Sequence, residues 1–299
     1  MRRPALASIA ACALLCACQN GTVTLSVTDA PIDGANLAKV RFTGIDLVEN
    51  DGSTHSLDLN PDVSVNLLAT SPTQLLGSIT VPEGDYKQIV LHVSADGSGT
   101  DSFVTYLTSA PVHAGQTLAM QIPDADVDGI TVPATFNVKR LHNTVLTADI
   151  DLRRSILEPD VSGDPLVLDL IGSSADTNVR VVNNEDVGTL TGSVAAGLVA
   201  SGSSCSPAAI YIYQGSGVTP DDEGGAGAQP FSSTTVPSGG TGSGFVSYTV
   251  GFLPPGPYTV ALVCNPVDDD PVTDDNLDAP AQQNVTIEAG VTTTAAVFQ

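Results

Sequence analysis

The segment Thr22-Val23-Thr24-Leu25-Ser26-Val27-Thr28 alternates apolar and polar side chains with a period of two. Successive side chains of an extended strand point to opposite faces, so this pattern predicts a strand with Val23, Leu25 and Val27 on its buried face. Similar runs rich in Val, Ile and Thr occur between Gly, Pro, Asn and Asp at residues 39–48, 86–94, 130–138, 145–152, 166–171, 208–213 and 258–264. Many short strands separated by turn residues predict an all-β protein of sandwich architecture.

A single helical turn is expected at residues 71–77. Ser71 would cap this turn, Pro72 would occupy its first position and Gly77 would end it. No long segment has apolar residues at helical spacing, so the fold class is predicted to be all-β.

Length and charge divide the chain into two parts. Its 299 residues are 42% hydrophobic, enough for two cores, and its net charge of −23 excludes nucleic acid as a partner. The last Lys or Arg is Arg180, and new strand-like runs begin near residue 188. We therefore expect two tandem β-sandwich domains, residues 18–186 and 187–299, after a leader of residues 1–17. Residues 215–244, rich in Gly, Ser and Pro, are expected to form a long mobile loop in the second domain.

The leader has the composition of a secretory signal. Met1-Arg2-Arg3 is positively charged, and the apolar run that follows is shorter than the roughly 20 residues that span a membrane. Its end, Leu15-Cys16-Ala17-Cys18, resembles the lipobox of bacterial lipoproteins. That resemblance implies a lipid on Cys18 as the membrane anchor, and Gln19 after it implies the outer membrane. The alternative is an ordinary cleaved signal with an incidental Cys.

Two further cysteines remain after the leader. Cys205 precedes the strand-like run 208–213, and Cys264 ends the run 258–264. In an oxidising compartment the two can form a disulfide, and the alternative is a pair of free thiols.

Three stretches of the first domain resemble the bacterial domain-of-unknown-function family numbered 4382. They are Leu25–Pro31 followed by Val40–Leu47, Asn66–Leu68 with Val81–Tyr86, and Ala148–Ile156. The resemblance covers residues 21–182 and implies an exported β-sandwich, common in lipoproteins, with no activity to transfer.

The second domain resembles the carboxypeptidase-regulatory or transthyretin-like sandwich. Its motifs are Gly192-Ser193-Val194, the segment Phe252–Val260, and Val285-Thr286-Ile287 with Ala289–Thr292. Where the family has an Asp-Gly turn, this chain has Gly242-Ser243-Gly244. The resemblance implies a structural or binding module.

Two acidic segments are candidates for cations. Asp124, Asp126 and Asp128 alternate before Gly129, as in the first half of a calcium loop, but the twelfth position is Thr135 where an EF-hand has Glu. The turn is therefore a reduced calcium loop or solvated acidic surface. The second segment crowds six acids into eleven residues, where we expect loose cation screening rather than a defined site; they are Asp268, Asp269, Asp270, Asp274, Asp275 and Asp278.

Catalytic motifs are weak. Asp149 and Asp151 are expected on one face of a strand and could act as acid and base on a glycan, but Arg153 and Arg154 follow and favour a structural salt bridge. His92 is expected to face solvent, and no Gly-x-Ser-x-Gly elbow occurs.

The sequence as a whole predicts a non-enzymatic lipoprotein of the cell envelope. Its two modules would bind a glycan, a surface polymer or a protein. The alternatives are a structural, cation-stabilised surface component and, less favoured, a glycan hydrolase. No cofactor is predicted apart from the calcium ion considered for Asp124, Asp126 and Asp128.

Overall fold

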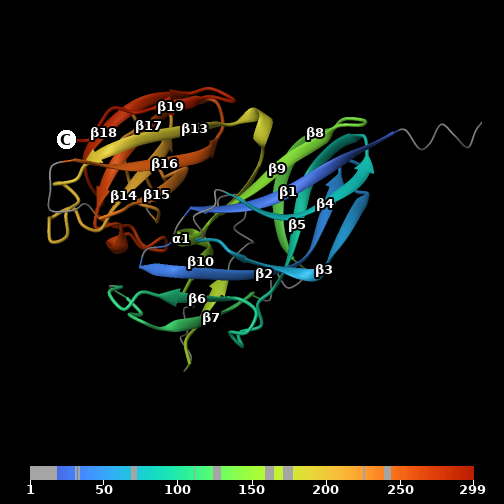
Figure 1. The fold of residues 1–299 in the computed structure, drawn as a ribbon, viewed down its shortest axis with the longest axis horizontal. Helices are drawn as coiled ribbons and strands as arrows, with labels where there is room; N and C mark the ends of the chain where they lie inside the picture. The colour runs from blue at the N-terminus through green and yellow to red at the C-terminus, as the bar shows by residue number, and fades with distance from the viewer. Residues whose placement is uncertain are drawn as a thin grey trace, which may run out of the picture.

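The computed structural model contains two β domains, which confirms the predicted all-β fold class (Figure 1). It describes residues 19–30, 32, 34–68, 73–110, 112–123, 129–158, 165–170, 178–224, 226–238 and 244–299. Cys18, the leader, and Asp124, Asp126 and Asp128 lie outside these residues, so lipidation and calcium binding there stay predictions.

The first domain packs two sheets around one core. The smaller sheet has the order β12 (Val179–Asn183), β9 (Asn143–Asp151), β1 (Asn20–Ala30), β4 (Gln74–Pro82). The larger sheet has the order β10 (Ile156–Leu157), β11 (Val167–Leu170), β7 (Thr117–Gln121), β6 (Phe103–Tyr106), β2 (Ala35–Glu49), β5 (Gly84–Ser94), β8 (Ile130–Val138), and β3 (Thr54–Asn66) also pairs with β2. The pairs β1–β9 and β11–β7 are parallel.

The alternation in β1 has the predicted consequence. Val23, Leu25 and Val27 are buried in the core of the first domain, and Thr22 and Thr24 are only partly buried. On the larger sheet, the rings of Tyr86 and Phe136 stack with centroids 5.1 Å apart. Burial of such side chains from two facing sheets supplies the main stabilising term of a sandwich.

The second domain packs a sheet of three strands against one of four. The first has the order β16 (Phe245–Leu253), β13 (Gly188–Ala195), β19 (Thr292–Thr294). The second has the order β15 (Ser232–Val236), β14 (Ala208–Gln214), β17 (Gly256–Cys264), β18 (Asp278–Ile287). In β14, Ile210 and Ile212 face the core between the sheets, and Tyr211 and Tyr213 belong to a second buried cluster on the other face. Segments outside the sandwich therefore cover the outer face of β14.

Two expectations about local structure are wrong. Residues 74–77, expected in a helical turn, belong to β4, where Gly77 pairs with Leu25 of β1 and Leu76 is buried; Ser71 and Pro72 lie outside the described residues. Strand pairing and burial outweigh the local cap signals. The predicted long loop 215–244 contains β15, because its Ser-Thr-Thr-Val run pairs along β14.

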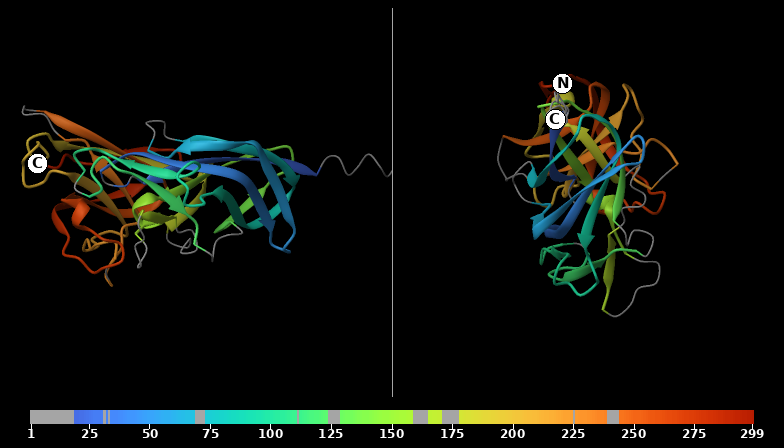
Figure 2. Two further views of the ribbon diagram at one scale, coloured as in Figure 1. Left: turned by 90° about the horizontal axis from the view of Figure 1, so that it is seen from below. Right: turned by 90° about the vertical axis from the view of Figure 1, so that its right-hand side faces the viewer.

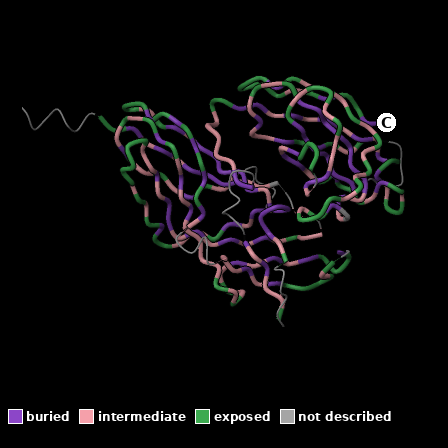
Figure 3. Tube along the Cα trace, turned by 180° about the vertical axis from the view of Figure 1, so that it is seen from behind, coloured by how far each residue is buried: buried purple, intermediate pink, exposed green. Residues whose placement is uncertain are grey.

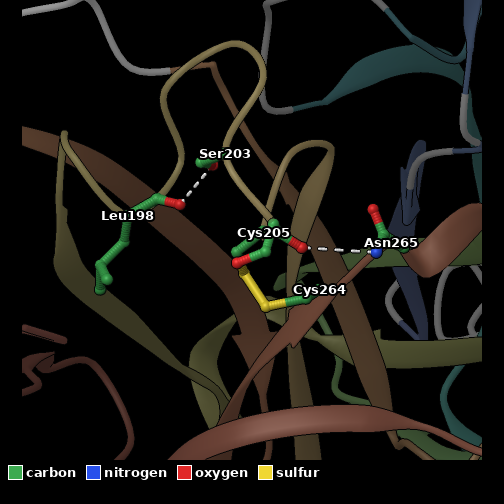
Figure 4. Close-up of a disulfide and its surroundings, with 6 residues drawn as sticks. Leu198, Ser203, Cys205, Cys264 and Asn265 are labelled. Carbon is green, nitrogen blue, oxygen red and sulfur yellow. Dashed lines mark hydrogen bonds between the residues drawn. A yellow bond between two sulfur atoms is a disulfide. The ribbon is translucent and has the colours of Figure 1, made fainter.

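A disulfide joins Cys205 and Cys264, the pair proposed from the sequence (Figure 4). Cys264 ends β17 opposite Ala208, the first residue of β14. Beside the bridge, Ser203 Oγ donates to the carbonyl of Leu198 at 2.7 Å and Asn265 Nδ2 donates to the carbonyl of Ser204 at 3.4 Å. The bond therefore fixes the segment that precedes β14.

The two domains lie end to end. Figure 2 shows β1 beginning at one end of the long axis, with the second domain at the other. The short helix α1 (Leu152–Ser155) lies where the domains meet, and buried segments run through each domain and through this junction (Figures 1 and 3). Within the described residues, no helix is long and apolar enough to cross a membrane.

Candidate functional site: the junction between the domains

Helix α1 places two arginines in the junction. The chain leaves β9 at Asp151, whose carboxylate caps the helix by accepting from the backbone N–H of Arg154 at 3.4 Å. All four helical residues are buried, so this single turn carries the side chains of Arg153 and Arg154 away from solvent toward the second domain.

Arg153 binds three side chains of the second domain. Its Nη1 atom donates to the hydroxyl of Tyr211 at 3.0 Å, to Glu223 Oε1 at 3.2 Å and to Ser233 Oγ at 3.3 Å. Its guanidinium carbon lies 5.2 Å from the centroid of the Tyr211 ring. Arg153 is 6% exposed and Glu223 is 2% exposed, so this is a buried ion pair across the junction.

Arg154 and Arg180 extend the same contact. Arg154 Nη2 donates to the carbonyl of Pro230 at 3.0 Å, and Arg180 Nη1 donates to the carbonyl of Phe231 at 2.6 Å. Arg180 also pairs with Asp149 and lies with its guanidinium carbon 4.3 Å from the centroid of the Phe231 ring. Three arginines of the first domain thus hold Glu223 and the segment 230–233 of the second.

The electrostatics of the junction explain this arrangement. Burial raises the pKa of Glu223 above its ordinary value, and the charges of Arg153 and Arg154 oppose that shift. Burial also raises the pKa of Asp151, again against the two arginines. From residue 181 onward the chain has no Lys or Arg. The positive charge beside Glu223 therefore comes from the first domain.

A cleft of about 370 Å³ opens beside the arginines. Both domains line it with carboxylates, amides, guanidinium groups and two aromatic rings: Asp149, Asp151, Arg154, Asn178, Arg180, Tyr213, Gln214, Ala228, Gln229, Pro230, Phe231 and Ser232. Ligand sites often form at domain interfaces, and this lining offers hydrogen-bond donors and acceptors beside apolar surface. The cleft is suited to a polar ligand with many hydroxyl groups.

A second cleft of about 610 Å³ lies between the domains and also includes Asp149. Its unusual member is Asp29, near the end of β1. Burial raises the pKa of Asp29 to about 8, and the negative charges of Asp149 and Asp151 act in the same direction. This carboxyl, whose pKa lies well above its ordinary value, is beside an Asp149 that is paired with Arg180.

The structure changes the sequence interpretation of Asp149 and Asp151. Both line the smaller cleft, but only Asp151 pairs with Arg154, at 4.0 Å, whereas Asp149 pairs with Arg180. Arg153, expected to pair within its own segment, reaches Glu223. Sequence reasoning missed Glu223 because no local pattern links residues 153 and 223. His92, expected to face solvent, has a side chain that is 35% exposed, with Nε2 2.9 Å from Asp46 Oδ2.

Three aspartates of the second domain could hold a metal ion. One carboxylate oxygen each of Asp222, Asp269 and Asp275 lies within 4.8 Å of the other two. Asp269 and Asp275 belong to the acidic segment noted in the sequence, but Asp222 comes from 47 residues before Asp269. Only the fold brings Asp222 to this cluster, so no spacing signal could have found it.

The fold and the junction define a two-domain, all-β protein whose domains are joined by buried ion pairs. Residues 20–165 match the family described as a domain of unknown function (DUF4382), so the first domain contains a DUF4382 domain. None of the curated proteins matches the chain significantly. The likeness of residues 188–299 to the carboxypeptidase-regulatory sandwich stays a prediction.

Solved structures give a distant resemblance to β proteins that include pilins and a candidate adhesin. The TIE protein of Bacillus anthracis is 11% identical with a TM-score of 0.21, and the match covers 94% of this chain and 34% of that protein. GBS52, the minor pilin of Streptococcus agalactiae, is 12% identical with a TM-score of 0.21, covering 92% and 94%. The candidate adhesin of Bacteroides ovatus is 8% identical with a TM-score of 0.24, covering 99% and 95%. This chain spans about a third of the first of these proteins, and no function is transferred from such low TM-scores.

Proposed function

We propose that this protein is a non-enzymatic lipoprotein of the cell envelope that binds a glycan in the cleft between its two domains. The observation that carries the proposal is the cleft of about 370 Å³ whose lining comes from both domains. The buried arginine contacts support it, because they hold the two walls of the cleft in a fixed relation, and a preorganised site loses less entropy on binding.

The chemistry of the lining favours a sugar over an apolar ligand. Carboxylate, amide and guanidinium groups can pair with the hydroxyl groups of a sugar, and Phe231 adds apolar ring surface. A surface polymer made of sugars fits the same description.

The arrangement of the domains supports a role in display. β1 begins at the end of the molecule opposite the second domain (Figure 2). With a lipid on Cys18, immediately before β1, the first domain would lie against the membrane. An 11-residue strand is about 36 Å long, so the cleft beyond β1 would be held away from the lipid surface.

Glycan binding can be tested with the detergent-solubilised full chain on a glycan array, followed by calorimetry with the best ligand. Replacing Gln229 by Ala in the cleft lining should weaken binding about tenfold, which corresponds to the loss of one or two hydrogen bonds. Gln282→Ala is the matched control, because Gln282 is exposed on β18 outside this lining. Equal losses from the two variants, or no glycan bound, would contradict the proposal.

The anchor is tested separately with Cys18→Ala. We expect this variant to leave the membrane fraction and to lose labelling by a clickable fatty acid, because several acyl chains give stable anchoring. Circular dichroism should show the β structure intact. Label retained on the variant would contradict lipidation at Cys18.

A glycan hydrolase is the second candidate, and one observation favours it. Asp29, whose pKa is raised by burial, lies beside Asp149, and such a pair of carboxyl groups resembles the acid and base of these enzymes. The ion pair between Asp149 and Arg180 argues against it, because the Asp149 carboxyl is already bonded to a guanidinium group. New reducing ends released from a bound glycan, and lost in Asp29→Asn, would favour the hydrolase.

A further inference from the structure

The second domain gathers three carboxylates from two segments that are far apart in the sequence. Asp222 lies in the segment between β14 and β15, whereas Asp269 and Asp275 lie between β17 and β18. The three oxygen atoms that face one another are all within 4.8 Å. Calcium binds oxygen at about 2.3–2.6 Å, so ligands on opposite sides of one ion are about 5 Å apart. The spacing is therefore that of ligands around a single calcium ion.

Asp222 provides an independent sign of a missing ligand. Its side chain is 0% exposed, and its Oδ2 atom accepts from the backbone N–H of Asp275 at 2.6 Å, so the carboxylate is turned toward the cluster. Its Oδ1 atom is buried without a hydrogen-bond partner among the residues that the structure describes. A buried carboxylate oxygen that has lost water and gained no donor is costly, and a bound cation removes that cost.

Neighbouring groups orient the other two carboxylates. Asp269 accepts from the hydroxyl of Tyr211 at 2.6 Å and from the backbone N–H of Glu223 at 3.0 Å. Asp275 Oδ2 accepts from the backbone N–H of Asp270 and from the hydroxyl of Thr273, both at 2.9 Å. Each carboxylate has about four acceptor positions, so free lone pairs remain for a metal while these donors fix its direction.

The two segments are also packed too closely for a side chain between them. A Cβ atom at Gly224 would lie 1.9 Å from the carbonyl oxygen of Thr273 and 2.7 Å from that of Asp270. Glycine at this position therefore lets the backbone after Asp222 approach the acidic segment. The carbonyl oxygens of Asp270 and Thr273 therefore lie beside Gly224, two residues after Asp222.

We propose that Asp222, Asp269 and Asp275 bind one calcium ion, which ties the segment between β14 and β15 to the segment between β17 and β18. An all-oxygen set of acidic ligands selects a hard dication over transition metals. Loop ligands suit calcium better than magnesium, which demands near-ideal octahedral geometry.

The proposed ion also lies beside the domain junction. Tyr211 donates to Asp269 and accepts from Arg153, and Glu223, the residue after Asp222, pairs with Arg153. By fixing Asp222 and Asp269, calcium would hold in place the residues that Arg153 contacts. This inference is independent of the ligand proposed for the cleft.

The test uses the detergent-solubilised full chain after treatment with a chelator. Calorimetric titration with calcium chloride should show one ion bound per chain through the proposed site. At a hundredfold excess over Kd, the melting temperature of the second domain should rise by about 10 °C relative to chelator. Identical melting in calcium and chelator, or an equal rise with magnesium, would overturn the proposal.

Matched variants locate the ion. Asp222→Asn and Asp275→Asn should each weaken calcium binding at least tenfold. In chelator, the melting temperature of Asp222→Asn should equal or exceed that of the unmodified protein, because the variant removes a buried charge. A variant that had lost calcium binding through damaged folding would instead melt at a lower temperature. Asp274→Asn makes the same change at an exposed position of the same segment and should bind calcium like the parent.

Asp126→Asn distinguishes the site from the acidic turn at residues 124–128. It should leave the calcium response at the second domain intact. Loss of calcium binding in Asp126→Asn, with full binding in Asp222→Asn, would place the ion in the first domain and overturn the proposal.

Discussion

The two domains share a fold class but differ in how they neutralise acidic side chains. The first domain contains every Lys and Arg of residues 19–299, and it pairs some of them at its surface: Arg41 binds Asp62 and Asp101, and its side chain is 38% exposed. The second domain has ten acids in residues 187–299 and no Lys or Arg. Its buried Glu223 is paired with Arg153 and Arg154 of the first domain.

This difference shows that charge balance crosses the domain boundary even though each domain has its own apolar core. A surface ion pair contributes little to stability because water already solvates both charges. A buried pair is different, since removing one partner leaves the other charge without water or counterion. The second domain should therefore depend on the first for stability, and the converse dependence should be weaker.

The largest expected effect is that of Arg153→Ala. It leaves Glu223 buried with one ion-pair partner fewer, so we expect a loss of about 3–5 kcal/mol in the free energy of unfolding of the second domain. Denaturant unfolding of the full chain, followed by near-ultraviolet signals from the tyrosines around β14, measures it. Arg41→Ala removes a surface guanidinium and should cost about 1 kcal/mol or less.

A second substitution sharpens this result. Glu223→Gln in the Arg153→Ala background removes the buried charge that the first change exposes, so it should restore part of the lost stability. Equal destabilisation by Arg153→Ala and Arg41→Ala would show that the two domains do not depend on each other in this way.

The next effect is specific to the second domain. Replacing Cys205 and Cys264 together by Ser should lower the free energy of unfolding by about 2–4 kcal/mol, because the bond closes a long loop in the unfolded chain. The first domain should be unaffected. Mass spectrometry after cleavage at Asp or Glu detects the bond, since trypsin has no site from residue 181 onward. Two free thiols in exported protein would contradict the pairing.

Local pattern was enough for most of the fold. Period-two alternation correctly predicted β1, and runs of β-branched residues predicted β2, β5, β8, β14 and β17, because burial on a sheet face follows from spacing alone. The predicted helical turn failed where pairing with β1 overrode the cap residues before Gly77. Helix-cap residues do not decide local structure where the edge of a neighbouring strand offers both backbone hydrogen bonds and burial.

The candidate sites depend on contacts that no local pattern contains. Arg153 and Glu223 are separated by 70 residues, and Asp222 and Asp275 by 53. Composition still indicated one feature of the junction: any buried acid in a domain without Lys or Arg must be neutralised by a positive charge from outside that domain. Composition does not show which acids are buried, because burial follows from packing.

The smallest expected effect is a pH dependence of stability that comes from Asp29, on the first domain's side of the junction. Burial raises the pKa of Asp29 from 3.8 to about 8, so the folded state holds a proton that the unfolded chain releases. The folded state binds more protons between these values, and stability therefore falls as the pH rises through this range.

The variant Asp29→Asn keeps the shape of the neutral carboxyl group but cannot ionise. It should therefore not lose stability as the pH rises. Asp29 is only partly shielded from water, so we expect the gain in stability from Asp29→Asn to be larger at pH 8.5 than at pH 5 by about 1 kcal/mol, or about 2–4 °C in Tm. Asp186→Asn, at an exposed position just before the second domain, should change Tm equally little at both pH values. A gain from Asp29→Asn at pH 5 as large as at pH 8.5 would show that Asp29 is ionised in the folded protein, and the protonated acid beside Asp149 would be excluded.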